Sequence, residues 1–143
     1  MNFTRSQFER LLLEHCANTG FQAPELLIHY LVNILDSRLT RVDIMPDPSF
    51  AERYLQLYNS SNPADYVDYA DSALLFCALM PDYGQRRGLS MDYYATLGIS
   101  TYYAAADMIA DDRYTQLGNW FYDLQRFLNS AIQPGVRLQL FRF

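Results

Sequence analysis

Residues 71–103 read DSALLFCALMPDYGQRRGLSMDYYATLGISTYY, and this stretch decides the fold. Two apolar, tyrosine-rich segments flank a loop that carries Arg86 and Arg87 between two glycines. Ser90 follows the loop at a position typical of a helix N-cap. The pattern predicts a pair of packed helices, and it contains no recognisable catalytic signature.

Helical spacing of apolar residues extends outward from this pair through most of the chain, and helix breakers divide it into about six predicted helices. The first begins at Thr4 or Ser6, where Ser6 and Glu9 form a capping-box pattern, and it stops at Gly20. Asp47 and Pro48 open a short third helix. The remaining predicted helices cover residues 24–38, 62–80, 90–110 and 117–131.

The helices at 62–80 and 90–110 are apolar over most of their circumference, which predicts that they lie at the centre of the fold. The last helix carries an unbroken apolar stripe from Leu117 to Ala131. After Pro134 the apolar residues alternate, as they do in residues 42–44, which indicates an extended tail. We expect the tail to lie in a groove, or to pair with residues 42–44 or with a second copy. No linker or repeat interrupts the pattern, so residues 1–143 are predicted to form a single all-α domain, a compact helical bundle.

The chain has 143 residues and a net charge of −5, carried by twelve Asp and four Glu against eleven Arg. An acidic domain lacks the field that nucleic-acid binding requires, so no nucleic-acid partner is expected. No apolar run approaches the length of a membrane span, and the charged start, MNFTRSQFERLLLEH, does not resemble a signal peptide. These features predict a cytoplasmic protein with no membrane partner.

Several chemistries are excluded by residues that the chain lacks. It contains no lysine, which excludes Schiff-base chemistry and the P-loop lysine. No Gly-x-Ser-x-Gly or Gly-x-Gly-x-x-Gly motif is present. Cys16 and Cys77 lie within apolar helical patterns and are expected to be buried free thiols. We therefore predict no catalytic residue and no cofactor.

A resemblance appears in residues 71–103. The residues that carry it are Asp71, Leu75-Phe76, Pro81, Tyr93-Tyr94, Gly98 and Tyr102, with the upstream ELLIHYL at 25–31. The pattern resembles a family of uncharacterised bacterial helical proteins of this size. Ala70 and Met80 depart from it, where the family usually has glycine and an aromatic residue. The resemblance implies an all-helical fold and supplies no activity or cofactor.

The two histidines are not expected to bind a metal. His15 continues the apolar face of the first helix and is expected to be buried and hydrogen-bonded. His29 follows Glu25 by four residues, a spacing that allows a shared metal. The chain has only four Glu and no Glu-x-x-His motif, whereas two-iron bundles use several of each. An exposed ion pair between Glu25 and His29 is the preferred interpretation.

The best candidate for a small binding site lies at the start of the helix at 90–110. Ser90 and the free backbone N–H groups there attract anions, and Arg86 and Arg87 can contact a phosphate or carboxylate. The arginines can equally pair with Asp82 or Asp71. Asp71 is a carboxylate expected to be partly buried and bound to Arg86, Arg87 or a tyrosine hydroxyl.

Twelve tyrosines exceed what a single core comfortably absorbs, and tyrosine is common at interfaces. The first hypothesis is thus a non-enzymatic interaction module, a homodimer or the binder of a protein partner, with a tyrosine-rich surface. The alternative is a ligand-binding bundle or small enzyme. Its site would lie between the fourth and fifth helices and would bring together Asp71, Arg86 or Arg87, and Tyr93 or Tyr94.

Overall fold

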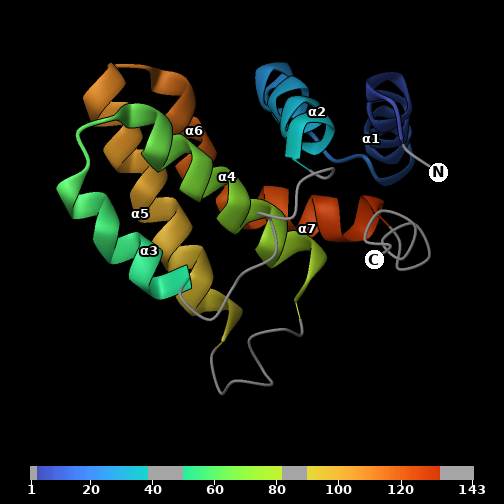
Figure 1. Ribbon diagram of the computed structural model, residues 1–143. Helices are drawn as coiled ribbons and strands as arrows, with labels where there is room; N and C mark the ends of the chain where they lie inside the picture. The colour runs from blue at the N-terminus through green and yellow to red at the C-terminus, as the bar shows by residue number, and fades with distance from the viewer. Residues whose placement is uncertain (1–2, 39–49, 82–89, 133–143) are drawn as a thin grey trace.

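A computed structural model describes residues 3–38, 50–81 and 90–132, and these residues form α-helices joined by short connections (Figure 1). No strand occurs in these ranges, so the all-α prediction is confirmed. The predicted tail after Pro134 and residues 42–44 lie outside the described residues. The elements, in chain order, are α1 (Arg5–Thr19), α2 (Glu25–Arg38), α3 (Phe50–Gln56), the 3-10 turn η2 (Leu57–Asn59), α4 (Pro63–Leu79), α5 (Met91–Ile109), α6 (Asp112–Asn119) and α7 (Phe121–Ala131).

Two predicted N-caps are found where the sequence places them. Asn62 Oδ1 accepts a hydrogen bond from the backbone N–H of Ala64 at 3.1 Å, and Pro63 occupies the first position of α4. Ser90 Oγ accepts a hydrogen bond from the backbone N–H of Tyr93 at 3.4 Å at the start of α5. Both bonds satisfy backbone donors that a helix leaves unpaired in its first turn.

The start of α1 differs from the prediction. The capping box is made by Thr4 and Gln7, so the predicted box of Ser6 and Glu9 is wrong. Thr4 Oγ1 accepts from the N–H of Gln7 at 3.2 Å, and Gln7 Oε1 accepts from the N–H of Thr4 at 2.7 Å. Glutamine completes this reciprocal pair as well as glutamate does. The helix ends as predicted at Gly20, which has a left-handed φ of 73°.

α4 is the central helix of the fold. Figure 1 shows α1 and α2 on one side of it and α3, α5 and α6 on the other. All side chains from residue 69 to residue 79 are buried, as expected for a helix that is apolar all round. α5 packs antiparallel to α4 and buries one face, which includes Gly98 and Tyr102. Other positions of α5 are partly exposed, with Tyr93 and Tyr103 each 38% exposed.

Gly98 is the point of closest approach between three helices. A Cβ atom at this position would lie 2.9 Å from the Cβ of Ala73 on α4 and 2.8 Å from Cε2 of Phe121 on α7. Real Cβ atoms do not approach so closely, because these separations lie well inside the contact distance of about 3.5–4.0 Å between carbon atoms. The absence of a side chain at Gly98 therefore sets the distances between α4, α5 and α7.

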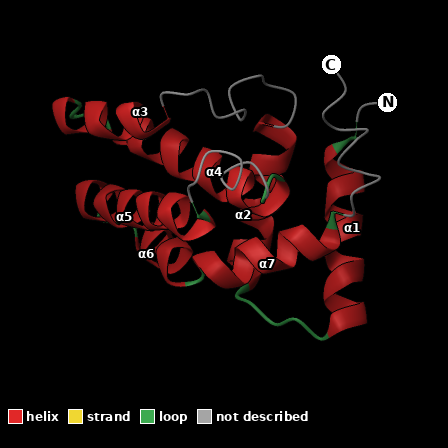
Figure 2. Ribbon diagram, turned by 90° about the horizontal axis from the view of Figure 1, so that it is seen from below, coloured by secondary structure: helices red, strands yellow, loops and turns green. Residues whose placement is uncertain are grey.

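The helix predicted at 117–131 is divided at Trp120 into α6 and α7. The backbone ψ of Trp120 is 4°, away from the helical value, and its N–H donates to the carbonyl of Gln116. Gly118 holds α6 against α5, since a Cβ there would lie 2.5 Å from Cε1 of Tyr103. Figure 2 shows α7 leaving α6 and crossing toward α1. After the change of direction α7 packs mainly against α4, whereas α6 packs mainly against α5.

Candidate functional site

Asp71 lies at the centre of a hydrogen-bonded cluster that joins α2, α4 and α5. Its side chain projects from the buried part of α4, and the residue is 2% exposed. The hydroxyls of Tyr30 on α2 and Tyr102 on α5 each donate to Asp71 Oδ1 at 2.7 Å. Arg38, the last residue of α2, donates from Nη2 to Asp71 Oδ2 at 2.9 Å. A buried carboxylate is stable only when it is paired and hydrogen-bonded in this way.

Arg38 extends the cluster to the protein surface. Its Nη2 also donates to Asp68 Oδ1 at 2.6 Å. The Arg38 side chain is 12% exposed, whereas the Asp68 side chain is 59% exposed. Within the described residues Arg38 Nε is buried and has no hydrogen-bond partner. The guanidinium therefore connects a buried carboxylate to an exposed one, one helical turn apart on α4.

Burial dominates the proton equilibria of the cluster. It raises the pKa of Asp71 from 3.8 to about 6, against the opposing effects of the Arg38 charge and of the hydroxyls of Tyr102 and Tyr30. Burial and the neighbouring Asp71 carboxylate raise the pKa of Tyr30 and of Tyr102 well above the usual value for tyrosine. Both tyrosines therefore keep their hydroxyl protons and remain hydrogen-bond donors at neutral pH.

Aromatic residues and a second arginine enclose the cluster. The Tyr114 ring stacks on Tyr102 with ring centroids 6.5 Å apart and meets Tyr30 edge-on at 6.2 Å. The guanidinium carbon of Arg113 lies 5.2 Å from the centroid of the Tyr114 ring and 5.7 Å from that of the Tyr30 ring. Cations above tyrosine rings are attracted to the ring faces. This packing separates Asp71 from solvent on the α6 side.

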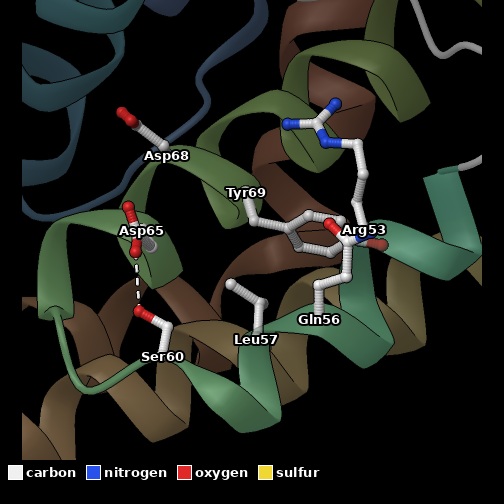
Figure 3. A pocket seen from close by; sticks show the side chains of 7 residues that line it. All are labelled: Arg53, Gln56, Leu57, Ser60, Asp65, Asp68 and Tyr69. Atoms are coloured by element: carbon white, nitrogen blue, oxygen red, sulfur yellow. Dashed lines mark hydrogen bonds between the residues drawn. The ribbon is translucent and has the colours of Figure 1, made fainter.

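A polar pocket of about 370 Å³ lies where Asp68 reaches the surface (Figure 3). Ser60 Oγ donates to Asp65 Oδ2 at 2.6 Å, so two of its polar groups bond to each other. The pocket carries charges of both signs, and Asp68 points away from the Ser60–Asp65 pair. Its lining residues are Arg53, Gln56, Leu57, Ser60, Asp65, Asp68 and Tyr69.

A second, apolar pocket of about 190 Å³ lies between η2, α4 and α5. The rings of Tyr54 and Tyr58 meet edge-on beside it, with centroids 6.1 Å apart. The hydroxyl of Tyr66 donates to the backbone carbonyl of Leu57 at 2.6 Å, so this ring presents carbon to the pocket while its polar end is satisfied. The lining residues are Tyr54, Leu57, Tyr58, Tyr66, Ser100, Thr101 and Ala104.

Exposed apolar side chains occur on the elements that line this second pocket. Tyr58 is 75% exposed, and Leu55, three residues earlier, is 61% exposed. Met108 is 40% exposed and follows the lining residue Ala104 by one helical turn. We call Leu55, Tyr58, Met108 and the lining of this pocket the aromatic face.

The predicted site residues do not form one described cluster. Asp71 is bound by tyrosine hydroxyls, one of the predicted options, and by Arg38, which was not among them. Ser90 is the N-cap of α5, and Tyr93 is exposed. Tyr94 is buried edge-on against Phe76, with centroids 4.9 Å apart. Arg86 and Arg87 lie outside the described residues.

Tyr94 and Tyr102 occupy different parts of α5. They are eight residues apart, which places their backbones about 12 Å apart along the helix axis. Tyr102 bonds Asp71, so Tyr94 lies about two turns from the carboxylate.

The histidines and cysteines behave largely as expected. His15 Nε2 lies 2.8 Å from Ser130 Oγ and is half-buried rather than fully buried. His29 and Glu25 form the expected exposed pair, 3.4 Å apart. Both cysteines are free thiols. Cys77 is buried as expected, and burial raises its pKa to about 12, whereas Cys16 is only partly buried, so its expected burial is wrong. No group of three metal-binding side chains occurs in the described part of the chain.

Two contributors to the cluster were not found by sequence reasoning. Arg38 stands at the end of α2, where a basic residue usually signals only an interaction with the helix dipole. Tyr114 is buried beside Tyr102, although the number of tyrosines led us to expect a tyrosine-rich surface. Tyr69 is also buried. The only sequence feature that points to Arg38 is its spacing. Tyr30, Ile34 and Arg38 are four residues apart, which places them on one face of α2.

No family model, curated protein or solved structure matches the chain. The resemblance to uncharacterised bacterial helical proteins stays a prediction. None of the helices that the structure describes has both the length and the apolar character needed to cross a membrane.

Proposed function

We propose that the chain is a non-enzymatic protein-interaction module whose binding surface is the aromatic face. The observation that carries the proposal is the exposure of Tyr58 and Leu55, 75% and 61%, beside a tyrosine-lined pocket. Contiguous apolar side chains in contact with water are typical of protein-binding surfaces. Tyrosine and methionine are enriched at such interfaces, where one end of the side chain packs and the other is polarisable or forms hydrogen bonds.

The hydrogen bonding and burial of Asp71 support a structural rather than a catalytic role for the buried cluster. Its carboxylate receives hydrogen bonds from three side chains and is 2% exposed. A general acid or base must come within hydrogen-bond reach of a substrate atom. The cluster instead ties α2 and α5 to α4, and α4 and α5 carry part of the aromatic face.

A ligand or enzyme site between α4 and α5 stays a prediction, and we do not propose it. It requires Asp71 to meet Tyr93 or Tyr94, whereas the partners of Asp71 are Tyr30, Tyr102 and Arg38. Tyr94 is packed against Phe76 instead.

The test is site-specific photo-crosslinking in cells that express the protein naturally. A benzophenone amino acid replaces Tyr58, and in a control it replaces Glu25, whose side chain is 88% exposed on α2. We expect a product of defined larger mass from position 58 alone. Equal crosslinking from both positions, or none from position 58, would contradict the proposal.

The same experiment separates a homodimer from a complex with another protein. A product of twice the chain mass identifies a second copy, and any other mass identifies a different partner. Native mass spectrometry of the purified protein then gives the oligomeric state directly. Tyr58→Ser with Leu55→Ser is expected to weaken the complex while leaving the helical content unchanged, because both residues lie outside the core. A cytoplasmic location belongs to the same proposal.

A further inference from the structure

One end of the molecule carries an excess of negative charge. Residues 104–112 read AAADMIADD and contain no basic residue. Asp107, Asp111 and Asp112 lie in this stretch, where α5 ends and α6 begins. Asp65 lies in the first turn of α4. Figure 1 shows the start of α4 and the turn from α5 to α6 at the same end of the molecule. We call Asp65, Asp107, Asp111 and Asp112 the acidic end.

Most of this charge is not neutralised by the described residues. Asp111 pairs with Arg113, with Oδ2 and Nη2 3.1 Å apart. Asp65 accepts from the Ser60 hydroxyl and Asp112 accepts from the Gln116 amide, both neutral donors. No arginine in the described ranges forms an ion pair with Asp65, Asp107 or Asp112.

Apolar side chains lie beside these carboxylates. Met108 and Ile109 are 40% and 41% exposed. Met108 directly follows Asp107, and Ile109 lies two residues before Asp111. Met108 also belongs to the aromatic face, whose pocket is lined by Tyr66 of α4 and Ala104 of α5. The acidic end and the aromatic face are therefore continuous.

We infer that the partner of this surface is a basic amphipathic segment of another protein, with apolar side chains on one face and Lys or Arg on the other. This inference rests on the proposed function, in which the aromatic face binds a protein. The neighbouring carboxylates indicate that this protein is basic. An apolar surface next to carboxylates attracts a helix whose apolar side chains pack on that surface while its cations pair with the carboxylates.

The same charge disfavours the other occupants of this face. A second copy placed against the acidic end would bring like charges together, which costs free energy at an interface. A nucleic acid would be repelled by the same carboxylates. A basic protein segment is the occupant that both the charge and the apolar side chains favour.

The experiment measures fluorescence anisotropy of three labelled helical peptides added to the full chain. Each has leucine at helical spacing, and the polar positions carry lysine, glutamine or glutamate. We expect the lysine peptide to bind about tenfold more tightly than the glutamine peptide, and the glutamate peptide to bind most weakly. The preference for lysine is expected to shrink as salt is added, because exposed charges are screened.

The variant Asp107→Asn with Asp112→Asn removes two charges and leaves the N-cap Asp111 in place. The control is Asp36→Asn with Glu14→Gln, which removes two exposed charges from α1 and α2. We expect the first variant to lose most of the preference for lysine and the control to keep it. Circular dichroism confirms that both variants are folded.

The outcomes separate this inference from the proposed function. Equal binding of all three peptides that is lost in Tyr58→Ser would overturn the basic partner and leave the interaction surface standing. Equal loss of the preference in both double variants would also overturn it, because net charge alone would then explain the binding. Failure of all three peptides to bind would contradict the surface itself.

Discussion

For Asp71 the sequence predicts burial but does not predict the hydrogen-bond partners of the carboxylate. Its neighbours on α4 are apolar, so its burial was expected from the sequence. The choice among possible partners depends on the positions of α2 and α5, and the structure selects Tyr30, Tyr102 and Arg38. These three residues are separated from Asp71 by more than thirty positions in the chain. Helical periodicity does not report contacts at that separation.

The pKa of Asp71 gives a stability prediction. Its folded pKa is about 6, above the ordinary value of 3.8, so the folded state holds the proton more tightly than the unfolded state does. This contribution to stability is complete below about pH 4 and is lost as the pH rises through about 6. Relative to Asp71→Asn, the free energy of unfolding of the wild type should fall by about 2 kcal/mol between about pH 4 and pH 7.

The measurement is urea denaturation of both proteins across that pH range. The asparagine variant removes the titrating group and keeps the size of the side chain, so the difference isolates Asp71. A difference that is constant with pH, or that grows in favour of the wild type as the pH rises, would show that Arg38 outweighs burial.

Tyr102→Phe tests the hydrogen bond to Asp71 directly. The substitution removes one donor from a buried carboxylate and should cost about 1–3 kcal/mol at pH 7. The cost should be smaller at pH 5, where more of Asp71 is protonated in the folded state. Thermal or urea denaturation measures both values. Tyr122→Phe, at a site that is 41% exposed, is the matched control and should change stability by less than about 0.5 kcal/mol.

At the scale of elements, the sequence located most helices but missed the break at Trp120. The apolar residues Leu117, Phe121 and Leu124 keep helical spacing across the break. A single residue with altered ψ does not disturb that spacing, so the pattern is the same for one helix and for two. Gly118 packs against Tyr103 of α5 two residues before the break, and apolar spacing along the chain does not report such a tertiary contact.

Gly98→Ala is predicted to destabilise the fold although alanine favours helices. The added methyl group would lie within 2.9 Å of both Ala73 and Phe121. Overpacking a core typically costs about 1–3 kcal/mol, which outweighs the gain of about 1 kcal/mol in helix propensity. Thermal denaturation should show a lower melting temperature. Thr96→Ala, at an exposed site on the same helix, should leave it unchanged or raise it slightly, and a stable Gly98→Ala variant would mean that α4 and α7 can move apart easily.

For the whole molecule, burial predicts a gradient of local stability. The second half of α4, residues 70–79, is entirely buried between the other helices, whereas no described side chain of α3 is fully buried. Amide hydrogens exchange slowly where opening requires global unfolding and quickly where few buried contacts are lost. Hydrogen exchange followed by mass spectrometry should find the slowest amides in residues 72–79 and much faster exchange in α3. Equal protection in the two segments would contradict the central position of α4.

The sequence by itself determined the all-α class, the bounds of α2, α4 and α5, and the placement of two apolar helices in the middle. These features depend on caps, breakers and periodicity, which act over a few residues. Only the tertiary structure decided the partners of Asp71, the break at Trp120 and the division of the tyrosines between core and surface. Tyr69, Tyr102 and Tyr114 are buried while Tyr58 is exposed, although all four lie in helical segments. Such distinctions depend on which helix faces meet, and those contacts join residues far apart in the chain.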